Sequence, residues 1–330
     1  MSARLDLVVT SVDDAVPGIR SVTLAAPDGA ALPPYTPGSH LVVDVPVGGG
    51  RTRKAANAYS LTGESVHPTS YAISVLRCAT TAEGGTGAGG SAWVHGLAVG
   101  DRLTATPPRS AFAPVHVATR HLLVGAGIGI TPLLSHLRSH VRWGRDAELV
   151  YVFRDGHGAH VDELKELGGD RVTFLHDRAG LAEHLAVRLA EQPLGTHLYT
   201  CGPAGFMDAV VATATDLGWP ASRVHLEPFG VAALDPGEPF TVGVAGRVLE
   251  VPSGTSLLEA LEDGGLSVPN LCRQGVCGEC RVEVAPGSGP VLHRDLYLDD
   301  ATRASGSCLM ACVSRALPAA DGRAHLEVTL

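Results

Sequence analysis

Three cysteines stand close together in the segment CRQGVCGEC, which runs from Cys272 to Cys280. Cys272, Cys277 and Cys280 have the C-x4-C-x2-C spacing with which plant-type [2Fe–2S] sites supply three of their four thiolates, the fourth coming from further along the chain. Gly275 and Gly278 lie between them, and glycine allows the positive φ angles that a loop wrapped around a cluster needs. The spacing predicts a [2Fe–2S] site.

A zinc site is the alternative interpretation of these cysteines, because four thiolates also suit a tetrahedral zinc ion. Zinc sites usually repeat a pair of cysteines two to four residues apart, whereas this loop holds three and no second pair follows. The pattern therefore favours iron–sulfur. Two cysteines, Cys308 and Cys312, are candidates for the fourth ligand, and spacing does not separate them.

The overall composition bounds the architecture around this loop. A chain of 330 residues is too long for one ordinary core and predicts two or three domains. The net charge of −9 argues against nucleic acid as a partner. No run of about 18 apolar residues occurs and the N-terminus has no signal-peptide pattern, so we expect a soluble, cytoplasmic protein without a membrane partner. Seven cysteines in a reducing compartment indicate metal binding and not a disulfide framework.

Residues 1–116 predict a β-barrel, because short alternating or apolar runs are separated by Gly, Pro and Asp turns. The segment GTGAGGSAWVH (85–95) follows these strands, and Ser91 is expected to cap a short helix there. A phosphate bound at the first amides of that helix is the functional interpretation. A flexible loop that ends in a capped helix is the structural alternative.

Residues 117–230 alternate apolar strands with helices, which predicts a doubly wound parallel sheet. The turn from Gly125 to Gly129 follows one strand and allows a backbone to approach a pyrophosphate, although its third glycine comes one residue earlier than in the standard fingerprint. Cys201 ends another strand, where a cysteine more often serves packing than chemistry. The ligand is expected at the carboxyl ends of the strands.

Residues 231–238 have the composition of a linker, and residues 239–330 predict a third, α+β domain. It starts with a hairpin in FTVGVAGRVLEVPSG (240–254) and a capped amphipathic helix in TSLLEALEDGG. The cysteine loop and further strands follow.

The whole chain resembles the phthalate dioxygenase reductase and vanillate O-demethylase reductase family. The motifs that carry the resemblance are, in chain order, GGS with a following histidine, GAGIGITP, YTCGP, HLEPFG, CRQGVCGEC, HRDLYL and CVSRA. The resemblance implies a flavin barrel that binds FMN, a pyridine-nucleotide domain and a C-terminal plant-type ferredoxin domain of β-grasp fold.

The resemblance also implies the flavin contacts. Tyr59 and Ser60 match the Tyr-Ser pair that flanks the isoalloxazine, with Ser60 near N5. Gly90 and Ser91 match the loop that holds the FMN phosphate. The family usually has an arginine where this chain has Asn57, so that phosphate contact is in doubt here.

Three cations near Asn57 are candidates to replace the missing arginine, namely Arg53, Lys54 and Arg77. The GGS loop argues for FMN over FAD, because the FAD-binding relatives carry a different sequence at this place.

The nucleotide and cluster residues follow in the same way. Gly127 and Thr131 match the pyridine-nucleotide turn, Cys201 matches the position beside the nicotinamide, and Phe229 matches an aromatic residue near the flavin. Ser60 and Cys201 are thus the expected catalytic residues. The family's fourth cluster ligand is the cysteine of CVSRA, which makes Cys312 the ligand and Cys308 a bystander.

NADH is the expected electron donor, because Asp155 next to Arg154 would repel a 2′-phosphate and accept a hydrogen bond from a free 2′-hydroxyl. The implied function is that of a monomeric reductase, which passes electrons from NADH through FMN and the cluster to a separate terminal oxygenase of the Rieske class. The alternatives are another acceptor, such as a P450, and a non-catalytic redox sensor.

Overall fold

The structure, a computed structural model, describes residues 4–46, 54–79, 90–110, 112–229, 235–270, 273, 275, 278–295 and 297–330. The chain divides into two units, Met1–Phe229 and Gly230–Leu330. Within the described residues, no helix has the length and apolarity that crossing a bilayer requires.

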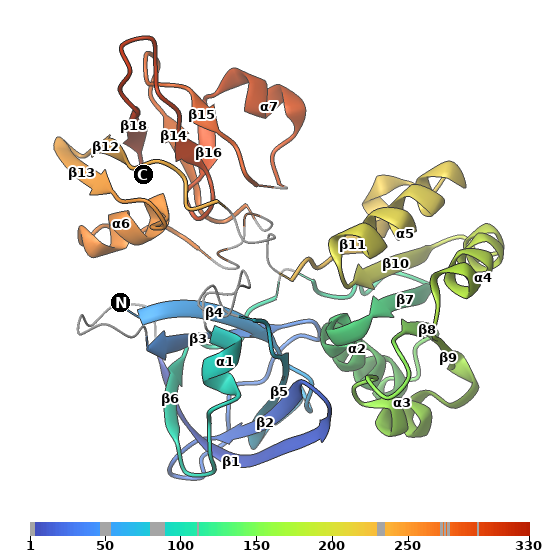
Figure 1. Cartoon of the computed structure of the whole chain (residues 1–330). Helices are drawn as coiled ribbons and strands as arrows, with labels where there is room; N and C mark the ends of the chain where they lie inside the picture. The colour runs from blue at the N-terminus through green and yellow to red at the C-terminus, as the bar shows by residue number, and fades with distance from the viewer. Residues whose placement is uncertain are drawn as a thin grey trace. The chain divides into compact units, whose positions relative to one another are not determined.

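A six-stranded antiparallel sheet forms the first part of the first unit (Figure 1). Alternate residues of its strands point inward, as Leu7, Val22 and Ile73 illustrate, and together they make a buried core. An isolated bridge between Leu61 and Ile73 joins the two ends of the sheet order and closes the barrel. In sheet order the strands are β4 (Lys54–Ser60), β3 (His40–Pro46), β6 (Arg102–Ala105), β1 (Leu5–Val16), β2 (Ile19–Ala25) and β5 (Ser70–Leu76), and α1 is Gly90–Val94.

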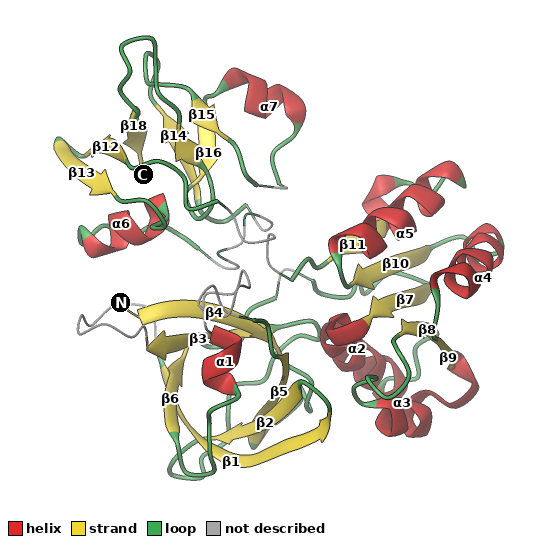
Figure 2. Ribbon diagram, in the orientation of Figure 1, coloured by secondary structure: helices red, strands yellow, loops and turns green. Residues whose placement is uncertain are grey.

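A five-stranded parallel sheet forms the rest of this unit, with helices on both faces (Figure 2). Its strands, in sheet order, are β11 (Val224–Leu226), β10 (Thr196–Cys201), β7 (Arg120–Ala126), β8 (Ala147–Val152) and β9 (Val172–Leu175). The helices are η2 (Gly127–Gly129), α2 (Ile130–Arg142), α3 (Val161–Gly168), η3 (Gly169–Arg171), α4 (Arg178–Ala190), α5 (Ala204–Asp216) and η4 (Ala221–Arg223).

The strand order reverses between β7 and β10, because β8 and β9 extend the sheet on one side of β7 and β10 and β11 on the other. Such a switch point leaves a crevice at the carboxyl ends of the strands, where ligands of open α/β sheets bind. The two Gly-containing turns that follow β7 and β10 therefore meet at one edge of the sheet.

The second unit is a mixed sheet with one main helix. Its strands are β12 (Phe240–Val244), β13 (Arg247–Val251), β14 (Arg281–Val284), β15 (Val291–Leu292), β16 (Cys308–Met310), β17 (Arg315–Ala316) and β18 (His325–Thr329), and its helices are α6 (Leu257–Asp263) and α7 (Asp300–Ser305). The main sheet has the order β13-β12-β18-β14-β16, with β12 and β18 parallel.

Helix α6 begins at a capping box, in which Ser256 and Glu259 satisfy each other's backbone amides. Its apolar side chains, Leu257, Leu258 and Leu261, are buried in the core of this unit. The same core contains Cys280, Cys308 and Cys312, so the strands bring the cysteines of distant segments together. The observed barrel, doubly wound sheet and β-grasp arrangement confirm the predicted fold class.

Candidate functional site

The turn after β7 lies directly against the turn after β10. Gly125 of β7 and Cys201 of β10 are paired in register. A Cβ atom on Gly129 would lie 2.3 Å from the carbonyl oxygen of Cys201 and 2.7 Å from the nitrogen of Gly202. Only glycine allows this approach of two backbones, so the residue type at position 129 joins the two predicted nucleotide motifs into one site.

Gly127 and Thr131 shape this turn from within. Gly127 has a positive φ of 54°, and its carbonyl oxygen accepts a hydrogen bond of 3.0 Å from the hydroxyl of Tyr151. Thr131 is buried, and its hydroxyl donates to the carbonyl of Ile128 at 3.0 Å. Both residues hold the backbone that would face a dinucleotide.

Cys201 is completely buried at the end of β10. Burial raises the pKa of its thiol well above the ordinary value, and the nearby carboxylate of Glu227 raises it further. The thiol is therefore neutral at physiological pH, and a thiolate nucleophile is not formed here.

Glu227 belongs to this edge of the sheet and was not among the residues expected from the sequence. It follows β11, and its backbone amide donates to the carbonyl of Thr200 at 3.1 Å. The segment HLEPFG contains Glu227, but the family resemblance points only to Phe229 within it. Phe229 itself is 39% exposed.

On the barrel, Asn57, Tyr59 and Gly90 lie together. Asn57 Nδ2 donates to the hydroxyl of Tyr59 at 3.3 Å, and a Cβ atom on Gly90 would lie 1.6 Å from Asn57 Nδ2 and 3.2 Å from that hydroxyl. Burial raises the pKa of Tyr59. Ser60, the last residue of β4, is buried and pairs with His40. The segment expected to carry the flavin ring and the start of the GGS helix are thus neighbours.

Ser91 does not cap α1, contrary to expectation, because the helix begins at Gly90 and Ser91 is its second residue. Its hydroxyl instead accepts a hydrogen bond of 3.0 Å from the backbone amide of Cys78, which ties the helix to the end of β5. Arg77, beside Cys78, is exposed and close to this junction. Lys54 begins β4, and Arg53 lies outside the described residues.

In the second unit, Cys280 and Cys312 come together. Their Sγ atoms are 3.2 Å apart, and the backbone amide of Gly275 donates to Cys312 Sγ at 3.2 Å. Two thiolates on one tetrahedral metal ion stand about 3.7 Å apart when each metal–sulfur distance is about 2.3 Å. The observed separation is about 0.5 Å shorter, so a small outward movement of the two sulfurs would let both bind a single iron. Cys272 and Cys277 lie outside the described residues.

Cys308, the other candidate ligand, is the first residue of β16 and pairs with Glu283 of β14.

Tyr297, an aromatic residue that was not predicted from the sequence, lies next to the cysteine loop. The ring of Tyr297 covers Gly278, where a Cβ atom would lie 2.3 Å from it, yet the side chain is 53% exposed. Its signal is its position in the motif HRDLYL.

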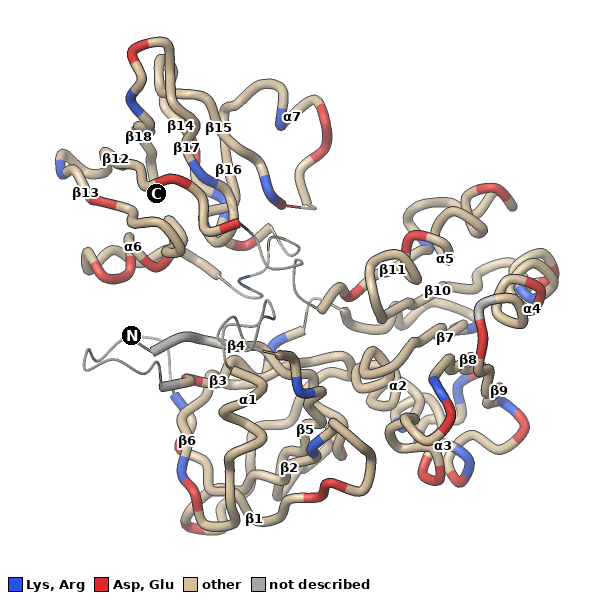
Figure 3. Tube along the Cα trace, viewed as in Figure 1, with Lys and Arg blue, Asp and Glu red and all other residues tan. Residues whose placement is uncertain are grey.

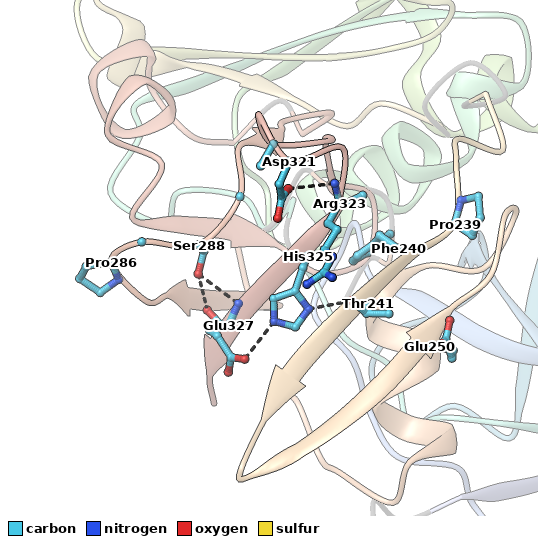
Figure 4. A pocket seen from close by; sticks show the side chains of 14 residues that line it. Pro239, Phe240, Thr241, Glu250, Pro286, Ser288, Asp321, Arg323, His325 and Glu327 are labelled. Carbon is cyan, nitrogen blue, oxygen red and sulfur yellow. Dashed lines mark hydrogen bonds and ion pairs between the residues drawn. The ribbon is translucent and has the colours of Figure 1, made fainter.

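A pocket of about 680 Å³ opens on the outer face of β12 and β18 (Figure 4). Thr241 Oγ1 lies 2.7 Å from His325 Nδ1, and His325 Nε2 lies 2.9 Å from Glu327 Oε1, so three side chains form a hydrogen-bonded row across it. None of the residues that line the pocket is a predicted flavin, nucleotide or cluster residue.

Comparisons with known proteins identify the family of this chain. A profile of the 2Fe-2S iron-sulfur cluster binding domain matches residues 240–317, and a profile of the dimethylamine monooxygenase subunit DmmA-like N-terminal domain matches residues 101–224. The heme-dependent oxidative N-demethylase beta subunit of Ectopseudomonas mendocina (strain ymp) is 41% identical over 321 residues, which cover 96% of this chain and 97% of that protein. Phthalate dioxygenase reductase of Burkholderia cepacia is 36% identical, with 94% of each chain covered.

A solved structure of phthalate dioxygenase reductase, described as modular for electron transfer from pyridine nucleotides to [2Fe–2S], matches with a TM-score of 0.81 at 33% identity. The match covers 99% of this chain and 98% of that one. The chain belongs to the phthalate dioxygenase reductase family. Membership confirms the predicted family, the oxidoreductase class, and the predicted set of FMN, NADH and a [2Fe–2S] cluster.

Gly129→Ala is expected to weaken NADH binding at least tenfold, because the added methyl meets the backbone of Cys201, which cannot move aside as a side chain would. Gly144→Ala is the control. Gly144, unlike Gly129, has a positive φ, 60°, but no atom lies within 4 Å of its Cβ position, so an alanine there costs only about 1 kcal/mol of backbone strain. Titration of each variant with NAD⁺ by calorimetry measures the affinity. Equal affinities of the two variants would contradict the role of this turn.

Proposed function

We propose that this chain is the reductase component of an oxygenase system and delivers electrons from NADH, one at a time, to a separate oxygenase. The observation that carries the proposal is the Cys280–Cys312 pair in a chain that also joins the two nucleotide turns at Gly129. When bound, FMN accepts a hydride from NADH and a [2Fe–2S] cluster passes single electrons onward.

In this proposal the first unit holds FMN on the barrel, residues 1–116, and NADH on the parallel sheet, residues 117–230. Tyr59 and Ser60 flank the flavin ring, and Asn57, Arg77, Gly90 and Ser91 form the phosphate end. The contact of Gly90 with Asn57 supports this, since the absence of a Cβ atom on Gly90 lets the side-chain amide of Asn57, a hydrogen-bond donor, lie against the start of α1.

The nucleotide end uses Gly127 and Thr131 to shape the turn that receives the pyrophosphate. Cys201 packs as a neutral thiol beside the nicotinamide, which its burial and raised pKa support. Phe229 would lie near the flavin ring, and its partial exposure is consistent with this role. The nearby Glu227 adds a negative charge on the same side.

The cluster is held by Cys272, Cys277, Cys280 and Cys312, in a domain of residues 239–330 that follows a linker of residues 231–238. The amide of Gly275 donates to Cys312 Sγ, and such N–H···S bonds tune the reduction potential of a cluster. We propose further that the protein acts as a cytoplasmic monomer.

The oxygenase partner is proposed to be a haem-dependent oxidative N-demethylase of an amine. The relative at 41% identity is a subunit of such an enzyme, and the profile over residues 101–224 comes from a dimethylamine monooxygenase subunit. A Rieske oxygenase, the partner expected from the sequence, is the second candidate, favoured by the similarity to phthalate dioxygenase reductase. Acidic residues on α6 and at the start of α7 (Figure 3) suit a basic docking face on either.

Anaerobic titration with NADH tests the reductase function. A flavin that takes two electrons and a cluster that takes one require about 1.5 equivalents of NADH per chain. An end point near one equivalent, without a change in the cluster bands, would contradict the electron path. Mixing the reduced protein with the haem subunit of the Ectopseudomonas mendocina demethylase, and separately with the oxygenase of the Burkholderia cepacia phthalate system, then distinguishes the two partner classes by the faster electron transfer.

A further inference from the structure

Helix α2 connects the two proposed cofactor sites of the first unit. It starts immediately after the Gly127–Gly129 turn, and its residue Arg138 reaches the barrel. Arg138 Nε donates a hydrogen bond of 2.9 Å to the carbonyl oxygen of Thr62. Thr62 is 2% exposed and comes two residues after Ser60, the last residue of the strand that carries the proposed flavin contacts.

A second contact fixes the other end of the Arg138 guanidinium, which forms an ion pair with Glu163 of α3. Glu163 Oε2 lies 2.9 Å from His160 Nδ1, and His160 Nε2 lies 2.8 Å from the hydroxyl of Ser74 on β5. The row from Arg138 to Ser74 therefore begins in the nucleotide part and ends in the barrel.

The protonation state of His160 suits this row. Burial, with the neighbouring Arg138, lowers the pKa of His160 to about 4, so the imidazole is neutral at physiological pH. A neutral ring donates from one nitrogen and accepts at the other, which allows Nδ1–H to donate to Glu163 and Nε2 to accept from Ser74. His160 also has a positive φ of 59°, an uncommon conformation for a residue other than glycine.

Helix α2 sets the distance between the nucleotide turn and the barrel contact at Arg138. Arg138 is seven residues beyond Thr131, or about 10 Å along a helix that rises 1.5 Å per residue. A rigid helix thus has one end at the nucleotide turn and is fastened, through Arg138, to the segment after Ser60. Hydride transfer needs reacting atoms about 3 to 3.5 Å apart, and a misplacement of 1 Å costs up to about 100-fold in rate.

We propose that Arg138 is a positioning residue, which sets the approach of the nicotinamide to the flavin by clamping α2 onto the barrel. The proposal rests on the proposed function and adds a residue that is not among the proposed cofactor contacts. It predicts that loss of the clamp slows hydride transfer without weakening either binding event.

Arg142, one turn further along α2, provides the matched control. It also reaches the barrel, where its Nη1 lies 2.9 Å from Glu64 Oε2. Both side chains of this pair are exposed, at 45% and 53%, and Arg142 contacts the barrel through a carboxylate side chain, whereas Arg138 donates to a backbone carbonyl. An exposed ion pair of this kind is screened by water and contributes little.

The test uses the holoprotein as Arg138→Met, Arg138→Lys and Arg142→Met. Flavin reduction by NADH is followed in anaerobic stopped flow, with NADH deuterated at C4 to identify the chemical step. Calorimetry with NAD⁺ gives the nucleotide affinity, and flavin fluorescence after denaturation gives the FMN content. Dithionite-reduced protein mixed with NAD⁺ reports ring stacking through its long-wavelength charge-transfer absorbance, which does not depend on turnover.

We expect Arg138→Met to lower the hydride-transfer rate roughly 10- to 100-fold and to weaken the charge-transfer band, with NAD⁺ affinity and FMN content within twofold of the unchanged protein. Arg138→Lys, which keeps the charge but loses the planar fork of donors, is expected to recover part of the rate and keeps the test open if Arg138→Met does not fold. Arg142→Met is expected within twofold of the unchanged protein.

Equal rates for Arg138→Met and Arg142→Met overturn the proposal, as does a loss of NAD⁺ affinity or FMN that accounts for the whole loss of rate. Failure of the unchanged protein to reduce its flavin with NADH is a different result, since it contradicts the proposed function and not the role of Arg138.

Discussion

We expect Cys312→Ser to abolish electron delivery to cytochrome c, while NADH still reduces ferricyanide through the flavin. In the proposed ligand set Cys280 and Cys312, whose Sγ atoms lie 3.2 Å apart, would share one iron, so removal of one sulfur would leave that iron with one thiolate fewer. Removing even a hydrogen-bonding neighbour of a metal ligand commonly costs 10- to 100-fold, and loss of a ligand itself is expected to cost at least about 100-fold.

The measurement combines absorption, low-temperature EPR of the NADH-reduced protein and the rates of reduction of cytochrome c and ferricyanide. We expect loss of the cluster bands beyond the flavin peaks, loss of the EPR signal and a collapse of the cytochrome c rate. The ferricyanide rate is expected to stay within about twofold, because its electrons leave from the first unit.

Cys308→Ala is the matched control, because Cys308 is also buried, lies four residues away and is replaced without adding a polar group to the core. It is expected to retain the cluster. If Cys308→Ala lost the bands and Cys312→Ser kept them, the ligand set would be wrong. If Cys312→Ser lost ferricyanide reduction as well, the division of labour between the units would fail. Zinc in the freshly purified protein, without cluster bands, would favour the alternative metal site.

The fold was predictable where local patterns agree with tertiary structure. The apolar run HLLVG before the glycine turn predicts β7 and the start of α2, because a buried strand followed by glycines has few alternatives in an α/β sheet. The cysteine spacing predicts the cluster loop for a similar reason, since three thiolates at those intervals suit one kind of site. Helix α4, Arg178–Ala190, was not predicted, although its buried Leu181, Leu185 and Leu189 recur every four residues, because the alanines and Val187 between them weaken the amphipathic pattern.

The choice between Cys308 and Cys312 was not available from spacing, because both lie at a workable distance from Cys280 along the chain. The fold separates them: Cys308 starts β16 and pairs with Glu283, whereas Cys312 follows the strand's end and turns toward Cys280. The resemblance had selected Cys312, and the geometry gives that selection a physical reason, although the ligand set itself remains a prediction.

Contacts between distant segments were equally out of reach of the sequence. Gly129 and Cys201 are 72 residues apart, and nothing in either motif says that one backbone rests on the other. Arg138 in α2 carries no motif, and its partner is a backbone carbonyl, which every residue has. Ser91 looked like a helix cap because serine favours that position, yet its hydroxyl bonds to Cys78 instead.

The parallel sheet of the first unit buries a cluster of histidines that predicts strong sensitivity to acid. His136 and His140 are completely buried on α2, and His140 stacks on His121 of β7 with ring centroids 4.0 Å apart. Among the described residues, neither ring nitrogen of His140 has a hydrogen-bond partner. The titratable or charged groups around these rings are His116, His121, Arg145, His197, Tyr199 and His225.

Burial lowers the pKa of His136 to about 3 and that of His140 to about 2, with the neighbouring histidines as a further cause. The unfolded value is near 6.5, so between that pH and about 3 the unfolded chain binds protons that the folded unit excludes. Stability is therefore fully present above pH 6.5 and falls as the pH decreases. At pH 5 each of the two histidines lowers the free energy of unfolding by about 2 kcal/mol relative to its value above pH 6.5. The sum of about 4 kcal/mol is comparable to the whole stability of many proteins, about 5 to 15 kcal/mol.

Urea unfolding of the first unit at pH 7.5, 6 and 5, followed by the fluorescence of its tryptophans, is expected to reveal this loss. His140→Leu fills the same buried space without a titratable ring, so its free energy of unfolding is expected to fall by about 2 kcal/mol less than that of the unchanged protein between pH 7.5 and 5. The exposed His157, replaced by glutamine, is the control and is expected to leave the pH dependence unaltered. An identical pH dependence in His140→Leu and the unchanged protein would mean that His140 accepts its proton in the folded state. That result would contradict the lowered pKa of the buried ring.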